Sequence, residues 1–533
     1  MRMKKRTAAR SMAALMGAAM VLTACGGGNT TAPTTGASSG GETQTASESA
    51  ESGKITKTDI VVGQASDIVT LDPAGQQDTT SGVLMKHAYS TLLDVDNEGK
   101  VVPDLAESYE MKSDTEYVFK LREDACFWDG TPVTAQDVKF SLDRAKGMPK
   151  TKSNTSKIEE VTVNGDHEVT IKLTEPYAAF KTIVTQHNLS ILSEKAVTEA
   201  GDSYGDVDNL LGSGPFKVTE WVPNDHYTLV RNDNYWGEMP IATSITCRVI
   251  PEGSARTIAL EAGEIDVVWS VDPTDCANVE SNPDVKLLSQ PSTGIDYVGM
   301  NTQKEKFSDK RVRQAINYAL DKQTFVDTII EGRGLVANSY INAAIPGWTD
   351  EVEAYPYDPE KAKELLAEAG YPDGFECSIF VNGDLRTRSA QILQAQLADV
   401  GIKVDISTYE WGALLDTLNA GEHEMFLLGW SNTSFDPDGS TYQLFYSGNH
   451  GATGNRAFFS NDKVDELILS AQRESEESKR MELYKELQFV LHDESPWCPL
   501  YYKENNVGVR ADLKGFTLHA GAQHYLGNCH YEE

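Results

Sequence analysis

A strand, a turn and the start of a helix follow one another in residues 117–138, which read YVFKLREDACFWDGTPVTAQDV. Apolar and polar side chains alternate over residues 117–121, as they do in a half-buried strand. Gly130 lies in the turn after this strand, where its lack of a Cβ atom permits a positive φ. Thr134 is a favourable N-cap, and the apolar residues after it have helical spacing. We therefore expect a strand, a turn and a helix in direct succession.

Strands and helices alternate through the rest of the chain. Each predicted helix in the second half is followed by a glycine, which commonly ends a helix. A helix, a glycine and a strand in direct succession are typical of an α/β layer, so the sequence predicts a mixed α/β protein, with two lobes. The predicted strands are residues 60–63, 169–173 and 402–406, and the predicted helices are residues 311–330, 358–369 and 389–400.

Composition and charge narrow the class of protein. The chain has 533 residues, of which 40% are hydrophobic and 24% charged, as in globular proteins with two large lobes or several domains. Lys and Arg number 47 against 80 Asp and Glu, which gives a net charge of −33. Nucleic-acid binding needs clustered Lys and Arg, so the charge argues against a nucleic-acid partner.

The N-terminus is typical of an exported protein. A basic segment precedes the apolar run 12–22, which is too short to span a bilayer. Residues 22–25, Leu-Thr-Ala-Cys, resemble the bacterial lipobox. This resemblance implies that residues 1–24 are a signal peptide and that Cys25 receives a diacylglycerol, becomes the mature N-terminus and anchors the protein to the membrane. A plain signal peptide with an incidental cysteine is the alternative.

A tether follows the predicted anchor. Residues 26–53 contain Gly, Ser, Thr, Ala and Glu but no aromatic or large aliphatic residue, so they cannot bury enough apolar surface to fold. We expect residues 25–56 to form the anchor and a disordered linker with a reach of roughly 30 Å.

Cysteines and histidines give no clear metal pattern. The six cysteines after Cys25 are widely spaced and include no Cys-x-x-Cys pair, so disulfides and free thiols both remain open. His519, His524, Cys529 and His530 match no standard metal site, and we expect no metal. The acidic segment 94–99 has Leu105 where a calcium loop requires Glu, which favours a polar hairpin turn.

Catalytic motifs are missing from the sequence. It contains no Gly-x-Ser-x-Gly, His-Glu-x-x-His, Walker or Gly-x-Gly-x-x-Gly pattern. No combination of nucleophile, base and oxyanion donor is visible either. We therefore expect a protein that is not an enzyme and that carries no cofactor.

Several segments together resemble the family 5 solute-binding proteins of ABC importers, which include dipeptide-, oligopeptide- and nickel-binding proteins. Any one of these segments is a weak match, but their number and order from about residue 71 to about residue 502 indicate this family. They are residues 117–138, 212–216 (GSGPF), 231–236 (RNDNYW), 262–266 (AGEID), 312–316 (VRQAI), 429–430 (GW) and 436–438 (DPD).

The resemblance implies a two-lobed fold similar to periplasmic binding proteins (type II, cluster C), with a ligand cleft between the lobes. Lobe I would comprise residues 57–292 and 504–533, with a subdomain at about 90–207. Lobe II would comprise residues 293–503. The expected connections between the lobes are residues 295–301 and 501–503, and we expect a monomer.

The resemblance places the ligand at the end of a buried strand around Trp430. In peptide-binding relatives, the backbone beside this Trp pairs with an extended peptide, and an Asp three residues later holds the peptide amine. Here that position is Thr433. Asp436 and Asp438 are nearby and could replace it, although a turn around Pro437 explains them equally well. This pattern favours oligopeptides over dipeptides.

Two further residues complete the expected site. Arg386 or Arg388 lies near the position of a carboxylate-binding Arg in dipeptide-binding relatives, and a guanidinium suits a carboxylate because it donates two parallel hydrogen bonds. Trp411 could form an aromatic wall. A solvated helix start and core packing are the alternative interpretations of these residues. The expected ligand-binding residues are Arg386, Trp411, Gly429, Trp430, Ser431, Asn432, Thr433 and Asp436.

The function expected from the resemblance is capture of peptides at the extracytoplasmic face of the membrane, for delivery to a permease driven by ATPase subunits. The location would be a periplasmic space or the cell surface. Another solute remains open within the same role, namely an oligosaccharide, a small metabolite or chelated nickel. An extracellular enzyme, which the missing catalytic motifs disfavour, and a receptor or adhesin without transport are the competing classes.

Overall fold

The folded part of the chain begins at strand β1. The computed structural model describes residues 54–533. The predicted signal peptide, the anchor at Cys25 and the linker up to residue 53 lie outside the described residues. Strand β1 (Ile55–Lys57) pairs with β19 (Tyr531–Glu532), so residues 55 and 56, which we expected in the linker, belong to the folded part.

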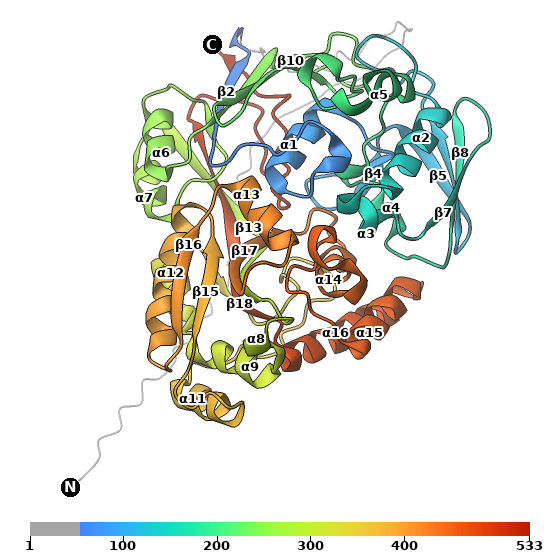
Figure 1. Ribbon diagram of the computed structural model, residues 1–533. Coiled ribbons are helices and arrows are strands. Elements are labelled where there is room, and N and C mark those ends of the chain that lie inside the picture. Colours follow the sequence, from blue (N-terminus) through green and yellow to red (C-terminus); the bar gives the residue numbers. More distant parts are fainter. Residues whose placement is uncertain (1–53) are drawn as a thin grey trace, which may run out of the picture. The chain divides into compact units, whose positions relative to one another are not determined.

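An eleven-stranded mixed sheet connects the N-terminal and C-terminal halves of the described chain (Figure 1). Strand β14 (Gly334–Val336) pairs with β18 beside the main path. In spatial order the other strands are β16 (Lys403–Thr408), β15 (Glu376–Val381), β17 (Met425–Ser431), β13 (Val285–Met300), β18 (Trp497–Arg510), β12 (Val267–Val268), β2 (Asp59–Gln64), β11 (Ser244–Val249), β10 (His226–Arg231) and β9 (Phe216–Val222).

The long strands β13 and β18 hold the two halves of this sheet together. Residues 285–291 of β13 pair with residues 504–510, beside β12, and residues 295–299 pair with residues 497–502, beside β17. The register shifts between Pro291 and Ile295. The expected connections 295–301 and 501–503 therefore lie within β13 and β18, except Asn301, and the shift comes just before the first of them.

A second, four-stranded antiparallel sheet lies in the N-terminal half. It contains the strands expected at residues 117–121 and 169–173, which are neighbours, and the helix expected after Thr134 follows it. The side chain of Thr134 accepts a hydrogen bond from Asp137 N, and the Asp137 side chain bonds back to Thr134 N. The strands are β5 (Ala106–Ser113), β6 (Glu116–Leu121), β8 (Glu168–Leu173) and β7 (Ile158–Val163), in that order.

The hairpin expected at the acidic segment 94–99 is confirmed. Strand β3 (Leu93–Val95) pairs antiparallel with β4 (Val101–Pro103). In the turn between them, the Asp96 carboxylate accepts hydrogen bonds from the backbone N–H groups of Glu98 and Lys100.

Helices pack against both sheets and form many of the connections between strands, as Figure 1 shows. The helices are α1 (Thr79–Ala88), α2 (Ala135–Lys146), α3 (Lys152–Thr155), α4 (Phe180–Ile183), α5 (Glu194–Ala200), α6 (Gly253–Glu261), α7 (Pro273–Ser281), α8 (Glu305–Ser308), α9 (Lys310–Ala319), α10 (Lys322–Thr328), α11 (Pro359–Glu368), α12 (Gly383–Ala398), α13 (Trp411–Asn419), α14 (Asp438–Phe445), α15 (Asp462–Arg473) and α16 (Glu477–Glu494).

Two of the three helices predicted in the second half have different bounds in the structure. The helix predicted at residues 311–330 is interrupted: Leu320 has an extended backbone, and the Asp321 carboxylate caps α10 by accepting from the N–H groups of Gln323 and Thr324. The helix predicted at residues 389–400 already begins at Gly383. The helix predicted at residues 358–369 is confirmed as α11.

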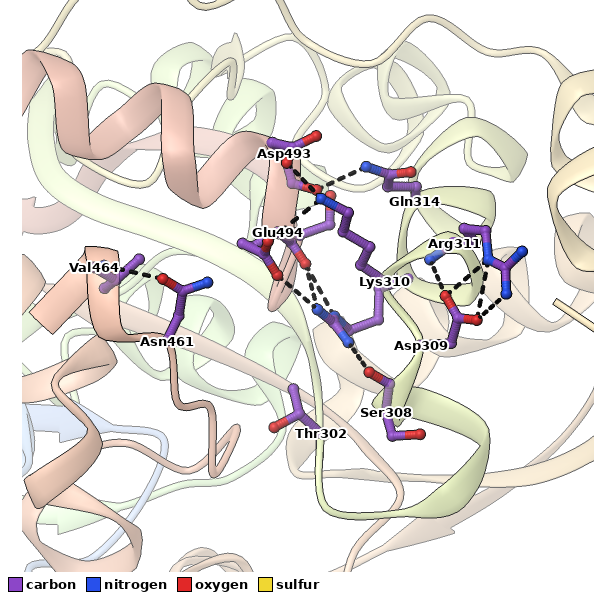
Figure 2. A network of polar contacts seen from close by, with 12 residues as sticks. Thr302, Ser308, Asp309, Lys310, Arg311, Gln314, Asn461, Val464, Asp493 and Glu494 are labelled. Atoms are coloured by element: carbon purple, nitrogen blue, oxygen red, sulfur yellow. Dashed lines mark hydrogen bonds and ion pairs between the residues drawn. The ribbon is translucent and has the colours of Figure 1, made fainter.

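The N-terminus of α9 is attached to the C-terminus of α16 by a polar network (Figure 2). Lys310 Nζ donates to Asp493 Oδ2 at 2.6 Å and lies 3.4 Å from Glu494 Oε1. Arg313, which is 3% exposed, donates from Nε and Nη2 to the backbone carbonyl of Glu494. Arg313 thus satisfies a carbonyl at a helix end, so the VRQAI segment has a structural role.

The GSGPF segment passes directly against the end of α1. A Cβ atom on Gly212 would lie 2.1 Å from the carbonyl oxygen of Ala88, and one on Gly214 would lie 2.6 Å from that of His87. Trp128 donates from its backbone N to Gly212 O and from Nε1 to Gly214 O. These glycines are therefore required by close backbone packing.

Two further features of the described chain are the state of its cysteines and the character of its helices. The six cysteines left open by the sequence are all free thiols within this part of the chain. No helix of the described chain combines the length and the apolar character needed to cross a bilayer.

Candidate ligand-binding site

A cavity of about 450 Å³ lies where the long strands meet elements of the N-terminal half. Asp78 and Gln186 line it from the N-terminal half, Tyr297 and Lys503 from the long strands, and Gly429 from β17. Its volume falls within the range of small-molecule sites, roughly 300–1,000 Å³. Both halves of the described chain thus contribute to one site.

One edge of β17 is open along this cavity. Strand β17 pairs with β13 over residues 425–431 but with β15 only at Met425 and Phe426. The backbone of residues 427–431 therefore has no strand partner on its second edge among the described residues. Residues 428–431 line the cavity. Gly429 is required there, because a Cβ atom would lie 2.9 Å from Asp296 Oδ1.

Most of the expected ligand residues line the cavity, and two do not. Asn432 is buried inside its own loop, where Nδ2 donates to Asp436 O at 2.7 Å and to Ser440 Oγ at 2.8 Å. Asp436 forms a buried, two-pronged ion pair with Arg480 of α16. The lining residues among those expected are Arg386, Trp411, Gly429, Trp430, Ser431 and Thr433.

Asp438, the other acid considered as a replacement for the missing Asp, is also engaged elsewhere. Its carboxylate accepts hydrogen bonds from Tyr177 OH at 2.5 Å and from Gln472 Nε2 at 2.9 Å. Burial raises the pKa of Asp438 to about 6. Thr433 instead donates to Gln186 Oε1 at 2.9 Å, so its hydroxyl contacts the N-terminal half.

Arg386 belongs to a cationic corner of the cavity. Asp296 lies 3.0 Å from Lys503 Nζ and 3.7 Å from Arg386 Nη2, so one carboxylate faces two cations. Arg386 Nε is buried and has no hydrogen-bond partner. The Arg386 guanidinium lies 5.9 Å from the ring centroid of Trp411. This corner is suited to a ligand carboxylate, because an anion would balance the excess positive charge.

Of the two arginines expected near the ligand, Arg386 is the one that lines the cavity. Arg388 does not line the cavity and lies 3.9 Å from Asp272. Asp296 and Lys503 were not among the expected ligand residues. Both lie in or next to the expected connections 295–301 and 501–503, and that position is the signal that could have identified them.

Asp78 brings a carboxylate to the cavity from the N-terminal half of the chain. Its Oδ1 accepts from Ser81 N at 3.0 Å and so caps α1, while its Oδ2 is buried and has no hydrogen-bond partner. Burial raises the pKa of Asp78, and the bond from Ser81 partly opposes that shift. No motif marks this residue in the sequence, because an N-cap Asp is common.

The C-terminal histidines pack within the fold. The backbone N of His519 donates to His524 Nδ1, and His519 Nδ1 accepts from the backbone of Gly521. Burial lowers the pKa of His524 to about 3, so its ring is neutral at pH 7. Residues 54–533 contain no cluster of three or more His, Cys, Asp or Glu side chains that could hold a metal ion.

The mixed α/β fold, with a cavity lined by both halves of the chain, matches that of the periplasmic binding proteins. The model of the bacterial extracellular solute-binding proteins, family 5 Middle, matches residues 100–452, and the chain belongs to this family. The family resemblance and the expected fold class are therefore confirmed.

Individual relatives agree with this assignment. The glutathione-binding protein GsiB of Shigella boydii serotype 4 (strain Sb227) is 32% identical over 479 residues, which covers 86% of this chain and 92% of the relative. The dipeptide-binding protein of Escherichia coli (strain K12) is 30% identical over 470 residues, with 81% and 86% covered. The structure of the ABC transporter-associated periplasmic binding protein DppA from Helicobacter pylori, in complex with the peptide STSA, superposes with a TM-score of 0.85 at 28% identity, covering 90% of this chain and 99% of DppA.

Proposed function

We propose that this family 5 solute-binding protein of an ABC importer captures short peptides with free termini. The observation that carries the proposal is the open edge of β17 along the cavity. An extended peptide presents alternating N–H and C=O groups, so it can add to such an edge as a further strand. A solute without a peptide backbone would leave these strand groups without equivalent partners.

Charges at the cavity support binding of both peptide termini. The corner formed by Arg386, Lys503 and Asp296 is suited to the C-terminal carboxylate. The position of the amine-binding Asp of relatives is occupied here by Thr433. Asp78, whose Oδ2 has no geometric hydrogen-bond partner, would bind the α-amine instead. Trp411 and Trp430 flank the open strand edge as apolar walls.

We propose peptides of about two to four residues rather than long ones. The expectation of oligopeptides depended on Thr433 in place of the amine-binding Asp and on the segment with Asp436 and Asp438. Both of these carboxylates are engaged by other side chains. A cavity of about 450 Å³ is also small for an extended chain of many residues. Relatives named for a dipeptide and for glutathione, and a neighbour with the four-residue peptide STSA, support this range.

The proposal also covers the two lobes, the membrane anchor and the transporter subunits. The ligand would lie between lobe I, residues 57–292 and 504–533 with a subdomain at about 90–207, and lobe II, residues 293–503. A ligand that touches both lobes stabilises their closed arrangement. A monomer held by a lipid on Cys25 would then deliver the peptide to a permease and its ATPase subunits.

Calorimetric titration of the purified full chain tests the peptide. Tri-alanine and tetra-alanine should bind. The C-terminal amide of tetra-alanine should bind about ten- to a hundredfold more weakly, because it loses a charge-assisted contact. Arg386→Gln should abolish this difference, whereas Arg311→Gln, at an exposed pair with Asp309, should preserve it. Binding of maltotriose or of a nickel–histidine complex, with no binding of any peptide, would refute the proposal.

A further inference from the structure

Arg456 is a buried cation at the cavity without an acidic partner. It is 6% exposed and lines the cavity. Its Nε donates to Asn419 Oδ1 at 3.0 Å, but Nη1 and Nη2 make no hydrogen bond to any residue of the described chain. No carboxylate within residues 54–533 comes within 4 Å of its guanidinium, and the acid whose charge acts on it from further away is Asp78. A buried charge without a direct ion pair is costly, so an anion bound here would stabilise the site.

The other cations that line the cavity all have acidic partners. Arg256 lies 3.4 Å from Asp272, and Arg333 lies 2.7 Å from Glu280. The pairs of Arg386 and Lys503 with Asp296 are described above. Among the lining cations of the described chain, Arg456 is therefore the one without a carboxylate within 4 Å.

A further hydrogen-bond donor without a partner lines the same cavity as Arg456. Tyr297 lines the cavity, and its hydroxyl makes no hydrogen bond to a described residue. Trp411, by contrast, faces the Asp78 carboxylate and lowers its pKa. Burial raises the pKa of Tyr297, and the charges of Arg456 and Arg386 oppose this shift. The Tyr297 hydroxyl is thus a second donor at the cavity that has no acceptor among the described residues.

The charge of the cavity differs from that of the chain. The protein carries 80 acidic against 47 basic residues, yet the cavity is lined by equal numbers of each. Burial also raises the pKa of Asp78 and of Asp272. The lining cations are Arg256, Arg333, Arg386, Arg456 and Lys503, and the acids are Asp78, Asp272, Asp296, Asp384 and Glu504.

We propose that Arg456, with Tyr297 OH, binds a second anionic group of the ligand, so that the preferred solutes are acidic peptides. This inference rests on the proposed peptide function and names a substrate class within it. A purely structural role for Arg456, holding its loop against the end of α13, uses only the Nε bond to Asn419. It leaves the two terminal nitrogens of the guanidinium unexplained.

The test compares two peptides that differ only in one charge, Ala-Glu-Ala and Ala-Gln-Ala, by calorimetric titration of the full chain. The wild type should bind the glutamate peptide about ten- to a hundredfold more tightly, as expected for hydrogen bonds to a charged group. Arg456→Gln should remove this preference, so that both peptides bind with similar affinity. Arg456→Lys should restore part of the preference, and Arg311→Gln should retain all of it.

The possible failures can be told apart. Equal affinities of the wild type for both peptides, or equal loss of both in Arg456→Gln, would overturn the anionic subsite while the peptide function stands. If neither peptide binds, the peptide function fails, and glutarate then tests the subsite alone. Glutarate binding that requires Arg456 supports the subsite, and no binding overturns it. Retained binding of Ala-Gln-Ala, or an unchanged unfolding transition, shows that the variant is folded.

Discussion

Replacement of Asp436 by Asn separates a structural role for this acid from a ligand-binding role. The side chains of Asp436 and Arg480 are 10% and 9% exposed and are joined by two hydrogen bonds. Asn is similar in shape but neutral, so it leaves the Arg480 charge buried and uncompensated. Breaking a buried ion pair in this way costs about 3–5 kcal/mol. We expect Asp436→Asn to lower the free energy of unfolding by that amount.

The assay combines urea unfolding with peptide titration. Tryptophan fluorescence gives the unfolding free energy, and calorimetry without urea gives the affinity of the folded protein. Asp233→Asn is the matched control, because Asp233 pairs with Arg231 at the surface and its side chain is 79% exposed. An exposed pair contributes about 0–1 kcal/mol. The control should therefore unfold almost as the wild type does.

The expected result is a large loss of stability with unchanged peptide affinity. The opposite result, in which Asp436→Asn unfolds like Asp233→Asn but binds peptide at least tenfold more weakly, would refute the reasoning. It would show that Asp436 contacts the ligand, as the sequence alone suggested, and that the ion pair with Arg480 is unimportant.

Three further predictions concern stability. Burial raises the pKa of Asp438 from 3.8 to about 6. Protonated Asp438 therefore stabilises the native state below about pH 4, and this contribution is lost as the pH rises through 6. Urea unfolding from pH 4 to 7 should show a flatter pH dependence of the unfolding free energy in Asp438→Asn than in the wild type. Gly214→Ala should cost at least about 1–3 kcal/mol in urea unfolding through overpacking, whereas Gly147→Ala, where the new Cβ meets one backbone atom at 3.4 Å, should be nearly neutral. Asp321→Ala should cost about 0.5–2 kcal/mol through loss of the α10 cap, and equal stability with the wild type would contradict that role.

Local sequence patterns predicted the elements well where the cause is local. Thr134 caps α2 and Asp358 caps α11, because capping needs only backbone groups within a few residues. The amphipathic pattern over residues 311–330 continued across Leu320 and Asp321, where the helix breaks. Hydrophobic periodicity alone cannot reveal such an interruption, because α9 and α10 both present apolar faces to the same core.

The predicted part of the site follows strand β17, with Arg386 and Trp411 added from two helices. The open edge of β17 and the loop after it are contiguous, so the motif around Trp430 located them. Asp78, Asp296 and Arg456 reach the cavity from distant segments and carry no motif. Asp436 was predicted to bind the ligand, but it pairs with Arg480. This pairing was not visible in the sequence, because Arg480 lies 44 residues away on another helix.

The pairing of β1 with β19 has a consequence for synthesis and export. The first strand of the folded part finds its partner in residues 531–532, and β12 pairs with residues 508–509 of β18. The eleven-stranded sheet and the β1–β19 pair therefore cannot be completed until residues 497–532 have been made. Until then, the nascent chain lacks strands that hold its two halves together. This order favours passage through a membrane channel as an extended chain, with folding completed on the far side.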